Sequence, residues 1–139
     1  METTSFANLN VVPERPGVYE IHTKSGIALK VGIAADLRRR LRQHGRSRQS
    51  RLRLIDGGTW DVPAAVQSAQ SILAKHLFFD RSLTADYDLQ SEQRRQKFLV
   101  NECIVKYTTT ADRAAAREIE RRLELGGGSF RYLGSTLVR

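Results

Sequence analysis

Two strand-like segments, at residues 17 to 23 and 27 to 33, constrain the fold of this chain more than any other feature. Proline and glycine open the first segment, and the short loop Lys24-Ser25-Gly26 separates it from the second, as in a β-hairpin. Residues 35 to 45 follow at once, with helix-forming residues throughout and a glycine at the end. The sequence therefore predicts an antiparallel hairpin followed directly by a helix.

Later apolar patterns complete a small α/β domain of the α+β type. A third strand is predicted at residues 103 to 108, and helices are predicted at residues 63 to 79 and 88 to 101. We expect one domain over residues 1 to 139, because a chain of this length buries one compact core. Its sheet should be small, mostly antiparallel and three-stranded, with helices flanking it.

A last helix is predicted near the end of the chain. It should begin after Thr110-Ala111-Asp112, a segment that suits a helix cap. Ala116, Ile119 and Leu123 form its apolar seam, and Gly126-Gly127-Gly128 should end it.

Composition excludes several classes of protein. The chain has no run of about 18 apolar residues that could cross a membrane, and its start lacks the basic and apolar segments of a signal peptide. Cys103 is the only cysteine, which excludes an internal disulfide and a cysteine-rich zinc site. We expect a cytoplasmic protein without membrane contact, with Cys103 as an inert core thiol.

The charge of the chain indicates a polyanionic partner. The formal net charge is +8, the isoelectric point is about 10.2, and arginine outnumbers lysine 18 to 5. Arginine suits paired hydrogen bonds to phosphate. Basic residues concentrate between residues 38 and 53, where a solvated helix face with a loop is the alternative explanation. The candidates for nucleic-acid contact there are Arg38, Arg39, Arg42, Arg46, Arg48, Arg51 and Arg53. Lys75 and His76 are further candidates, with a structural role as the favoured alternative for His76.

Three short motifs give the chain a resemblance to a known family. Gly17-Val18-Tyr19, then Lys30-Val31-Gly32, then Arg40 stand in the order of the signature of the GIY-YIG nucleases, which this chain resembles. It looks most like small stand-alone members and the nuclease module of bacterial excision-repair incision enzymes. A second likeness, to the family's glutamate-bearing helix, lies at residues 116 to 123. Residues 46 to 101 have no counterpart in the family, so we expect a helical insertion there.

The resemblance implies roles for three residues. Tyr19 matches the family tyrosine that orients the attacking water or the phosphate. Arg40 follows Gly32 by eight residues, as the family's helix arginine does, and would grip the phosphate. Glu120 would be the ligand of one Mg²⁺, or of Mn²⁺, because a hard oxygen donor leaves most coordination positions to water and substrate.

Glu118 competes with Glu120 for the metal. At about 100° per residue along a helix, Glu120 lies close to the seam through Ile119 and Leu123, whereas Glu118 and Glu124 point farther toward solvent. A metal ligand must face the body of the protein, so Glu120 is preferred. An ordinary surface ion pair is the alternative.

Lys30 stands where many members of the family carry the tyrosine proposed as general base, so that role cannot be transferred. Alternation along residues 27 to 33 puts the apolar side chains on one face and Lys30 with Gly32 on the other, outside the core. Lys30 then acts as a base or, more easily, stays charged and clamps the phosphate. His44, one helical turn after Arg40, is the better base because imidazole titrates near neutral pH.

The sequence also departs from the family near its end. The late asparagine has no match in Ser129-Phe130-Arg131-Tyr132. We expect a Mg²⁺-dependent endonuclease that hydrolyses DNA, with a preference for single-stranded DNA that rests on the small size of the chain alone. One alternative, based on Lys30 and the missing asparagine, is a catalytically inactive nucleic-acid-binding module with the same fold. Another is an RNA-binding or RNA-cleaving protein. The sequence predicts no particular protein partner.

Overall fold

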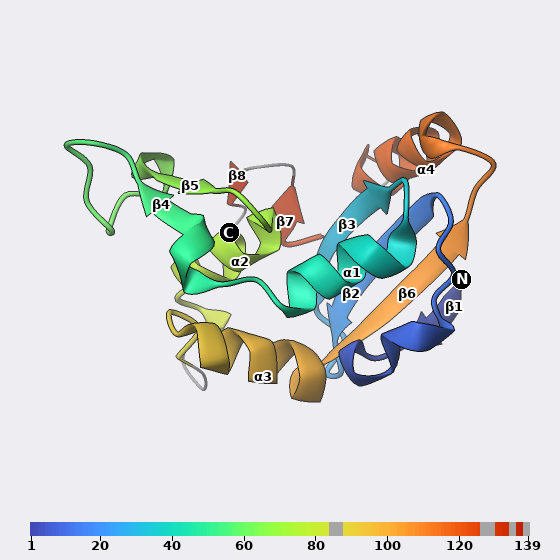
Figure 1. The fold of residues 1–139 in the computed structure, drawn as a ribbon, viewed down its shortest axis with the longest axis horizontal. Coiled ribbons are helices and arrows are strands. Elements are labelled where there is room, and N and C mark those ends of the chain that lie inside the picture. Colours follow the sequence, from blue (N-terminus) through green and yellow to red (C-terminus); the bar gives the residue numbers. More distant parts are fainter. Residues whose placement is uncertain (84–87, 126–129, 134–135, 138–139) are drawn as a thin grey trace.

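The computed structural model describes residues 1–83, 88–125, 130–133 and 136–137, which form an α+β fold with a main sheet and a separate hairpin (Figure 1). The main sheet contains β1 (Glu2–Thr4), β2 (Gly17–Thr23), β3 (Ala28–Ala34), β6 (Cys103–Thr109), β7 (Tyr132–Leu133) and β8 (Thr136–Leu137). The hairpin consists of β4 (Leu52–Leu54) and β5 (Val66–Ser68). The helices are α1 (Leu37–Gly45), α2 (Ile72–Phe79), α3 (Glu92–Glu102) and α4 (Arg113–Leu125), with 3₁₀ turns at Phe6–Val11, Gln49–Arg51 and Pro63–Ala65.

The main sheet has the strand order β1-β6-β2-β3-β7-β8. Its first four strands are antiparallel neighbours, which confirms the predicted hairpin and the antiparallel sheet. Gly26 turns the hairpin with a φ of 102°, in the left-handed region that favours glycine. The prediction of three strands was too low, because β1, β7 and β8 have only two or three residues each and show no periodic pattern.

The two faces of β2 and β3 bury different side chains, as alternation along a strand requires. One face packs with α1 and includes Tyr19, Ile21, Leu37 and Leu41. The other face packs with α4 and includes Val18, Val31, Phe130, Ile119 and Leu123. Helices therefore cover the sheet from both sides, with the largest cluster on the α1 side. No described helix has the length and apolar character needed to cross a membrane.

A β-bulge changes the predicted alternation in β3. Ile21 pairs with Lys30, but the next residue, His22, pairs with Ala28, so Leu29 is the extra residue. Leu29 joins the same core cluster as Tyr19. The prediction that Lys30 lies outside the core was wrong: its exposed fraction is 5 %, because it shares the covered α1 face of the sheet.

The predicted helix at residues 63 to 79 was wrong over its first half. Residues 63–65 form a 3₁₀ turn and β5 pairs with β4, burying Val66 against Leu52. The α-helix begins only after Ser71, whose hydroxyl accepts a hydrogen bond from the Ala74 N–H at 3.3 Å. The region predicted as a helical insertion thus contains a β-hairpin as well as α2 and part of α3.

The other predicted helices are present with shifted ends. The helix predicted from residue 88 begins at Glu92, after the cap Ser91. Asp112 caps the last helix by accepting from the Ala115 N–H at 2.8 Å, as predicted. The predicted glycine end at residues 126 to 128 lies outside the described residues. Burial raises the pKa of the Cys103 thiol to about 12, which fits the predicted inert core thiol.

Candidate active site

Three elements bring charged and polar side chains to Lys30 on β3. Burial lowers the pKa of Lys30 and raises the pKa of Tyr19, on β2; the charge of Arg40, on α1, acts to lower both pKa values, and the charge of Glu120, on α4, acts to raise both. The pKa of His44 is lowered by burial and then by the charges of Arg40 and Lys30. Because such effects need short distances, the five residues predicted from the sequence lie around one place in the fold.

Tyr19 and His44 form the buried centre of this site. Tyr19 Oη lies 2.6 Å from His44 Nε2, and His44 Nδ1 lies 2.6 Å from Ser71 Oγ. Ser71 Oγ already accepts the Ala74 N–H, and a second lone pair remains for a proton on Nδ1. The Ser71 hydroxyl can also donate to Nδ1, so these contacts fit either neutral tautomer of His44. The proton transfer proposed below uses the tautomer in which His44 donates through Nδ1 and accepts the Tyr19 proton at Nε2.

Burial keeps both groups in their neutral forms. Tyr19 and His44 are each 1 % exposed. Burial raises the pKa of Tyr19 to about 12, although Arg40 opposes the change. Burial, and then the charges of Arg40 and Lys30, hold the pKa of His44 well below 6.5. At pH 7 the tyrosine is therefore protonated and the imidazole neutral.

Gly32 makes room for the Tyr19 ring, its partner across the hairpin. A Cβ added at Gly32 would lie 2.9 Å from Tyr19 Cε1, and closer still to Oη and Cζ. Only glycine avoids this overlap. The Tyr19 ring is therefore the physical reason for a glycine at this position.

The segment before α2 holds Arg40. The Arg40 guanidinium donates through Nη1 to Gln43 Oε1 at 3.2 Å and to the Gln70 carbonyl oxygen at 3.3 Å. Gln70 and Ser71, adjacent in the chain, therefore position Arg40 and His44 respectively. The sequence analysis missed both residues, and no local pattern links them to α1.

α4 contributes two carboxylates, Glu120 and Glu124, four residues apart and both half-buried. Glu118 is exposed and pairs with Arg122 at 3.5 Å, which supports the preference for Glu120. The expectation that Glu124 points to solvent was wrong, since its charge has the largest charge effect on the pKa of Lys30. The i, i+4 spacing from Glu120 was the available signal.

These carboxylates suit a hard cation. Burial and the charge of Glu124 raise the pKa of Glu120, while Lys30 opposes them. A bound Mg²⁺ would relieve the repulsion between the two glutamates, and it prefers oxygen ligands. Within the described part of the chain, no group of three or more His, Cys, Asp or Glu side chains is placed to hold a metal. Water and substrate would therefore supply the other ligands.

Arg38 has a structural role that the sequence did not indicate. Its guanidinium donates to the carbonyl oxygens of Val12 and Asn10 at 2.7 and 3.1 Å, and to Glu14 Oε1 at 2.7 Å. These three bonds tie the N-terminal segment to α1. The predicted contact of Arg38 with nucleic acid would have to compete with all of them.

The other predicted nucleic-acid contacts differ in exposure. Arg39, Arg46, Arg48, Arg51 and Arg53 are exposed, and Arg42 and Lys75 are half-buried. His76 has an exposed fraction of 0 %, and its ring stacks on Tyr132 with centroids 4.8 Å apart. Its predicted contact with nucleic acid was wrong, because the packing of α2 against β7 buries the imidazole.

Asp80 fastens β7 beside Lys30. Its carboxylate accepts two hydrogen bonds from Arg131 and one, at 2.6 Å, from Tyr132 Oη. Burial raises the pKa of Asp80, but these hydrogen bonds outweigh burial and the pKa is lowered. Since Tyr132 is the partner of Lys30 in β3, this cluster fixes the backbone beside the site.

Comparison with models of known protein families finds no match, and a search of curated proteins finds none either. The chemistry of Tyr19, Lys30, Arg40, His44 and Glu120 is therefore what points to a function.

Proposed function

We propose that the chain is a metal-dependent endonuclease that hydrolyses DNA phosphodiester bonds at a site like that of the GIY-YIG nucleases. The observation that carries the proposal is the electrostatic coupling of Tyr19, Lys30, Arg40 and Glu120, which four separate elements bring together. Binding nucleic acid requires only positive charge. A half-buried carboxylate beside the cations serves catalysis, where a metal must be held near the phosphate. A cytoplasmic location is part of the proposal.

Arg40 and Lys30 are the proposed phosphate contacts. Gln43 and Gln70 orient the Arg40 guanidinium, which offers paired donors to phosphate oxygens. Burial lowers the pKa of Lys30, and an incoming phosphate would favour its charged form. Both cations would then stabilise the extra negative charge of the transition state.

His44 would act through Tyr19, because both its ring nitrogens are engaged and its ring is buried. The attacking water would pass a proton to Tyr19 Oη while the tyrosine proton moves to His44 Nε2. Burial, and after it the charges of Arg40 and Lys30, hold the pKa of His44 low, and a bound phosphate would offset those two charges. The imidazole would therefore accept the proton only with substrate in place.

Glu120, with Glu124 beside it, would hold the Mg²⁺, or Mn²⁺ in its place. When bound, such an ion supplies positive charge to the phosphate and the leaving oxygen. The contribution of the chain is to keep these carboxylates facing Lys30, which lowers the pKa of Glu120 against the effects of burial and of Glu124.

A catalytically inactive nucleic-acid-binding module is the second candidate. The observation that favours it is the burial of Tyr19, Lys30 and His44, with exposed fractions of 1, 5 and 1 %. A substrate would reach Tyr19 Oη only if neighbouring side chains moved. RNA is kept as an alternative substrate, because the positive charge acts on either backbone.

The test is cleavage of end-labelled DNA and RNA of mixed sequence, single-stranded and duplex, in Mg²⁺ or EDTA. The proposal predicts Mg²⁺-dependent cutting of DNA that is lost in Glu120→Ala and kept in Glu118→Ala, the matched control on the same helix. Equal cutting of both strand forms would remove the preference for single strands. Binding without cutting of any substrate would favour the inactive module.

A further inference from the structure

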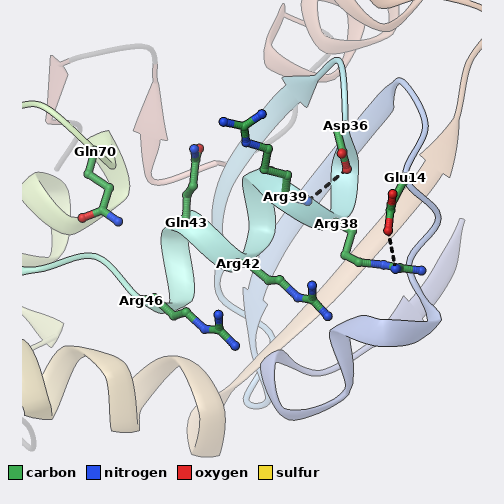
Figure 2. A pocket seen from close by; sticks show the side chains of 8 residues that line it. All are labelled: Glu14, Asp36, Arg38, Arg39, Arg42, Gln43, Arg46 and Gln70. Carbon is green, nitrogen blue, oxygen red and sulfur yellow. Dashed lines mark hydrogen bonds and ion pairs between the residues drawn. The ribbon is translucent and has the colours of Figure 1, made fainter.

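A hollow of about 390 Å³ lies on the outer face of α1, away from the core (Figure 2). Arg39, Arg42 and Arg46 line it from the helix, together with the side chains of Gln43 and Gln70. Figure 2 shows the guanidinium groups of Arg42 and Arg46 extending in the same direction from α1. We call this site the α1 hollow.

The three arginines lack carboxylate partners within the described part of the chain, where no ion pair includes them. Like charges placed on successive turns of one helix repel one another. An anion that enters between Arg42 and Arg46, whose guanidinium groups extend the same way (Figure 2), would relieve that repulsion and gain charge-assisted hydrogen bonds.

The two carboxylates at the edge of the hollow are already engaged. Glu14 Oε1 accepts from Arg38 at 2.7 Å, and Asp36 Oδ1 accepts the Arg39 N–H at 3.0 Å as the cap of α1 (Figure 2). The remaining lining of the hollow is rich in hydrogen-bond donors.

The glutamines add donors rather than acceptors. Gln43 Oε1 accepts from Arg40, and Gln70 Oε1 accepts the Arg48 N–H at 3.1 Å. With the oxygens used in this way, each amide has its NH₂ group left to donate. A ligand of the α1 hollow should therefore be an anion with several acceptor oxygens, as a phosphate is.

The same two glutamines connect the α1 hollow to the candidate active site. The Gln43 side chain and the Gln70 carbonyl oxygen both accept from Arg40, while both residues also line the hollow. A strand whose scissile phosphate lies at Arg40 can therefore continue over Gln43 into the hollow without crossing an unpaired carboxylate.

We propose that the α1 hollow binds a backbone phosphate of the nucleic-acid strand, next to the phosphate held by Arg40. This inference rests on the proposed function, and it gives the substrate a direction: the strand runs from the site outward across α1. Arg42 and Arg46 would anchor the uncut part of the strand and take no part in the chemistry.

The test is binding of a fluorescein-labelled single-stranded oligonucleotide in EDTA, by fluorescence anisotropy over a series of salt concentrations. For a single strand the slope of log affinity against log salt is roughly 0.7 per neutralised phosphate. The double variant Arg42→Gln, Arg46→Gln should lower the slope by about 0.7, the value for one phosphate, and weaken binding about tenfold or more at low salt. Arg94→Gln, an exposed arginine on α3, is the control for one lost charge and should change the slope little.

The outcomes separate this inference from the proposed function. If the wild type and the double variant give equal slopes of log affinity against log salt, the hollow does not bind a backbone phosphate, whether or not the protein cuts DNA. A lower slope in a protein that never cuts would support the hollow while the nuclease proposal fails. A third outcome is that the double variant loses binding of inorganic phosphate but keeps the oligonucleotide affinity of the wild type. The α1 hollow would then be a site for small anions, which also overturns the inference. Circular dichroism checks that the variants fold.

Discussion

Substitution of Gly32 by alanine should destabilise the protein by displacing Tyr19. The added Cβ would lie 2.9 Å from Tyr19 Cε1 and closer to Oη, and the backbone of two paired strands fixes its position. Because the Tyr19 ring is buried between the sheet and α1, it cannot move without breaking its 2.6 Å contact with His44 Nε2.

Three effects give the expected magnitude. Overpacking of a buried site costs about 1–3 kcal/mol, and loss of the Tyr19–His44 hydrogen bond costs about 1 kcal/mol more. Alanine also lowers the conformational entropy of the unfolded chain, which stabilises the folded protein by about 0.4–1 kcal/mol and partly offsets these costs. The free energy of unfolding should therefore fall by about 2 kcal/mol.

The assay is urea unfolding followed by circular dichroism and by the fluorescence of Trp60, the only tryptophan. Tyr19→Phe alone should cost about 1–2 kcal/mol, because His44 Nε2 loses its donor. Since Gly32→Ala and Tyr19→Phe remove the same hydrogen bond, the variant carrying both should lose about 1 kcal/mol less stability than the sum of the two single losses. Gly45→Ala, where the nearest atom is 3.1 Å away, is the control and should change stability by less than Gly32→Ala. A neutral Gly32→Ala, or strict additivity with Tyr19→Phe, would refute the reasoning.

Three further predictions concern charge and proton transfer. Asp80→Asn should lower the free energy of unfolding by about 3 kcal/mol, because Arg131 loses its buried partner. In the wild type the contribution of Asp80 is fully present above the pKa of the unfolded state, and it is lost as the pH falls through the lowered pKa of the folded state. The stability of the variant should therefore change less with pH at low pH, in an acid unfolding series. Because the pKa of His44 is lowered in the folded state, the unfolded state binds the proton first as the pH falls. The free energy of unfolding should therefore decrease below pH 6.5, by at most about 1.4 kcal/mol per pH unit. Urea titrations over a pH series should give a smaller slope of stability against pH for His44→Asn. Tyr19→Phe should cut DNA about a hundredfold more slowly under single-turnover conditions while binding it as the wild type does, and an unchanged rate would exclude Tyr19 from the proton path.

Local signals explain how much of the fold was predictable. The hairpin turn at residues 24 to 26, the cap Asp112 and the apolar seam of α4 are contained in short stretches of sequence, and all were predicted. β7 was not predicted, because a strand of two residues leaves no periodicity, and its Tyr132 pairs with Lys30 about a hundred positions away. The helix predicted over residues 63 to 79 failed since β4, a non-local partner, takes Val66 into a strand.

The site was predictable where a motif fixed it. Tyr19 and Arg40 followed from motif order, and Glu120 followed from its place beside the apolar seam of the last helix; the structure brings all three to Lys30. The alternation placed Lys30 correctly on the face of Gly32, but local sequence did not show that this face is covered, so Lys30 was wrongly predicted to lie outside the core. The bulge moves only Leu29 into that core, and it has no sequence signature in this hairpin. Ser71 and Gln70 contact α1 only through the tertiary fold.

The central claim is that Glu120 and Arg40, from two distant elements, act on the same phosphate. The most direct test is the single-turnover cleavage rate of end-labelled single-stranded DNA in Mg²⁺ for the wild type, Glu120→Gln and Glu118→Gln. The account predicts a loss of at least about a hundredfold for Glu120→Gln, with Glu118→Gln close to the wild type. Equal rates for the two variants, or cleavage that persists in EDTA, would contradict it.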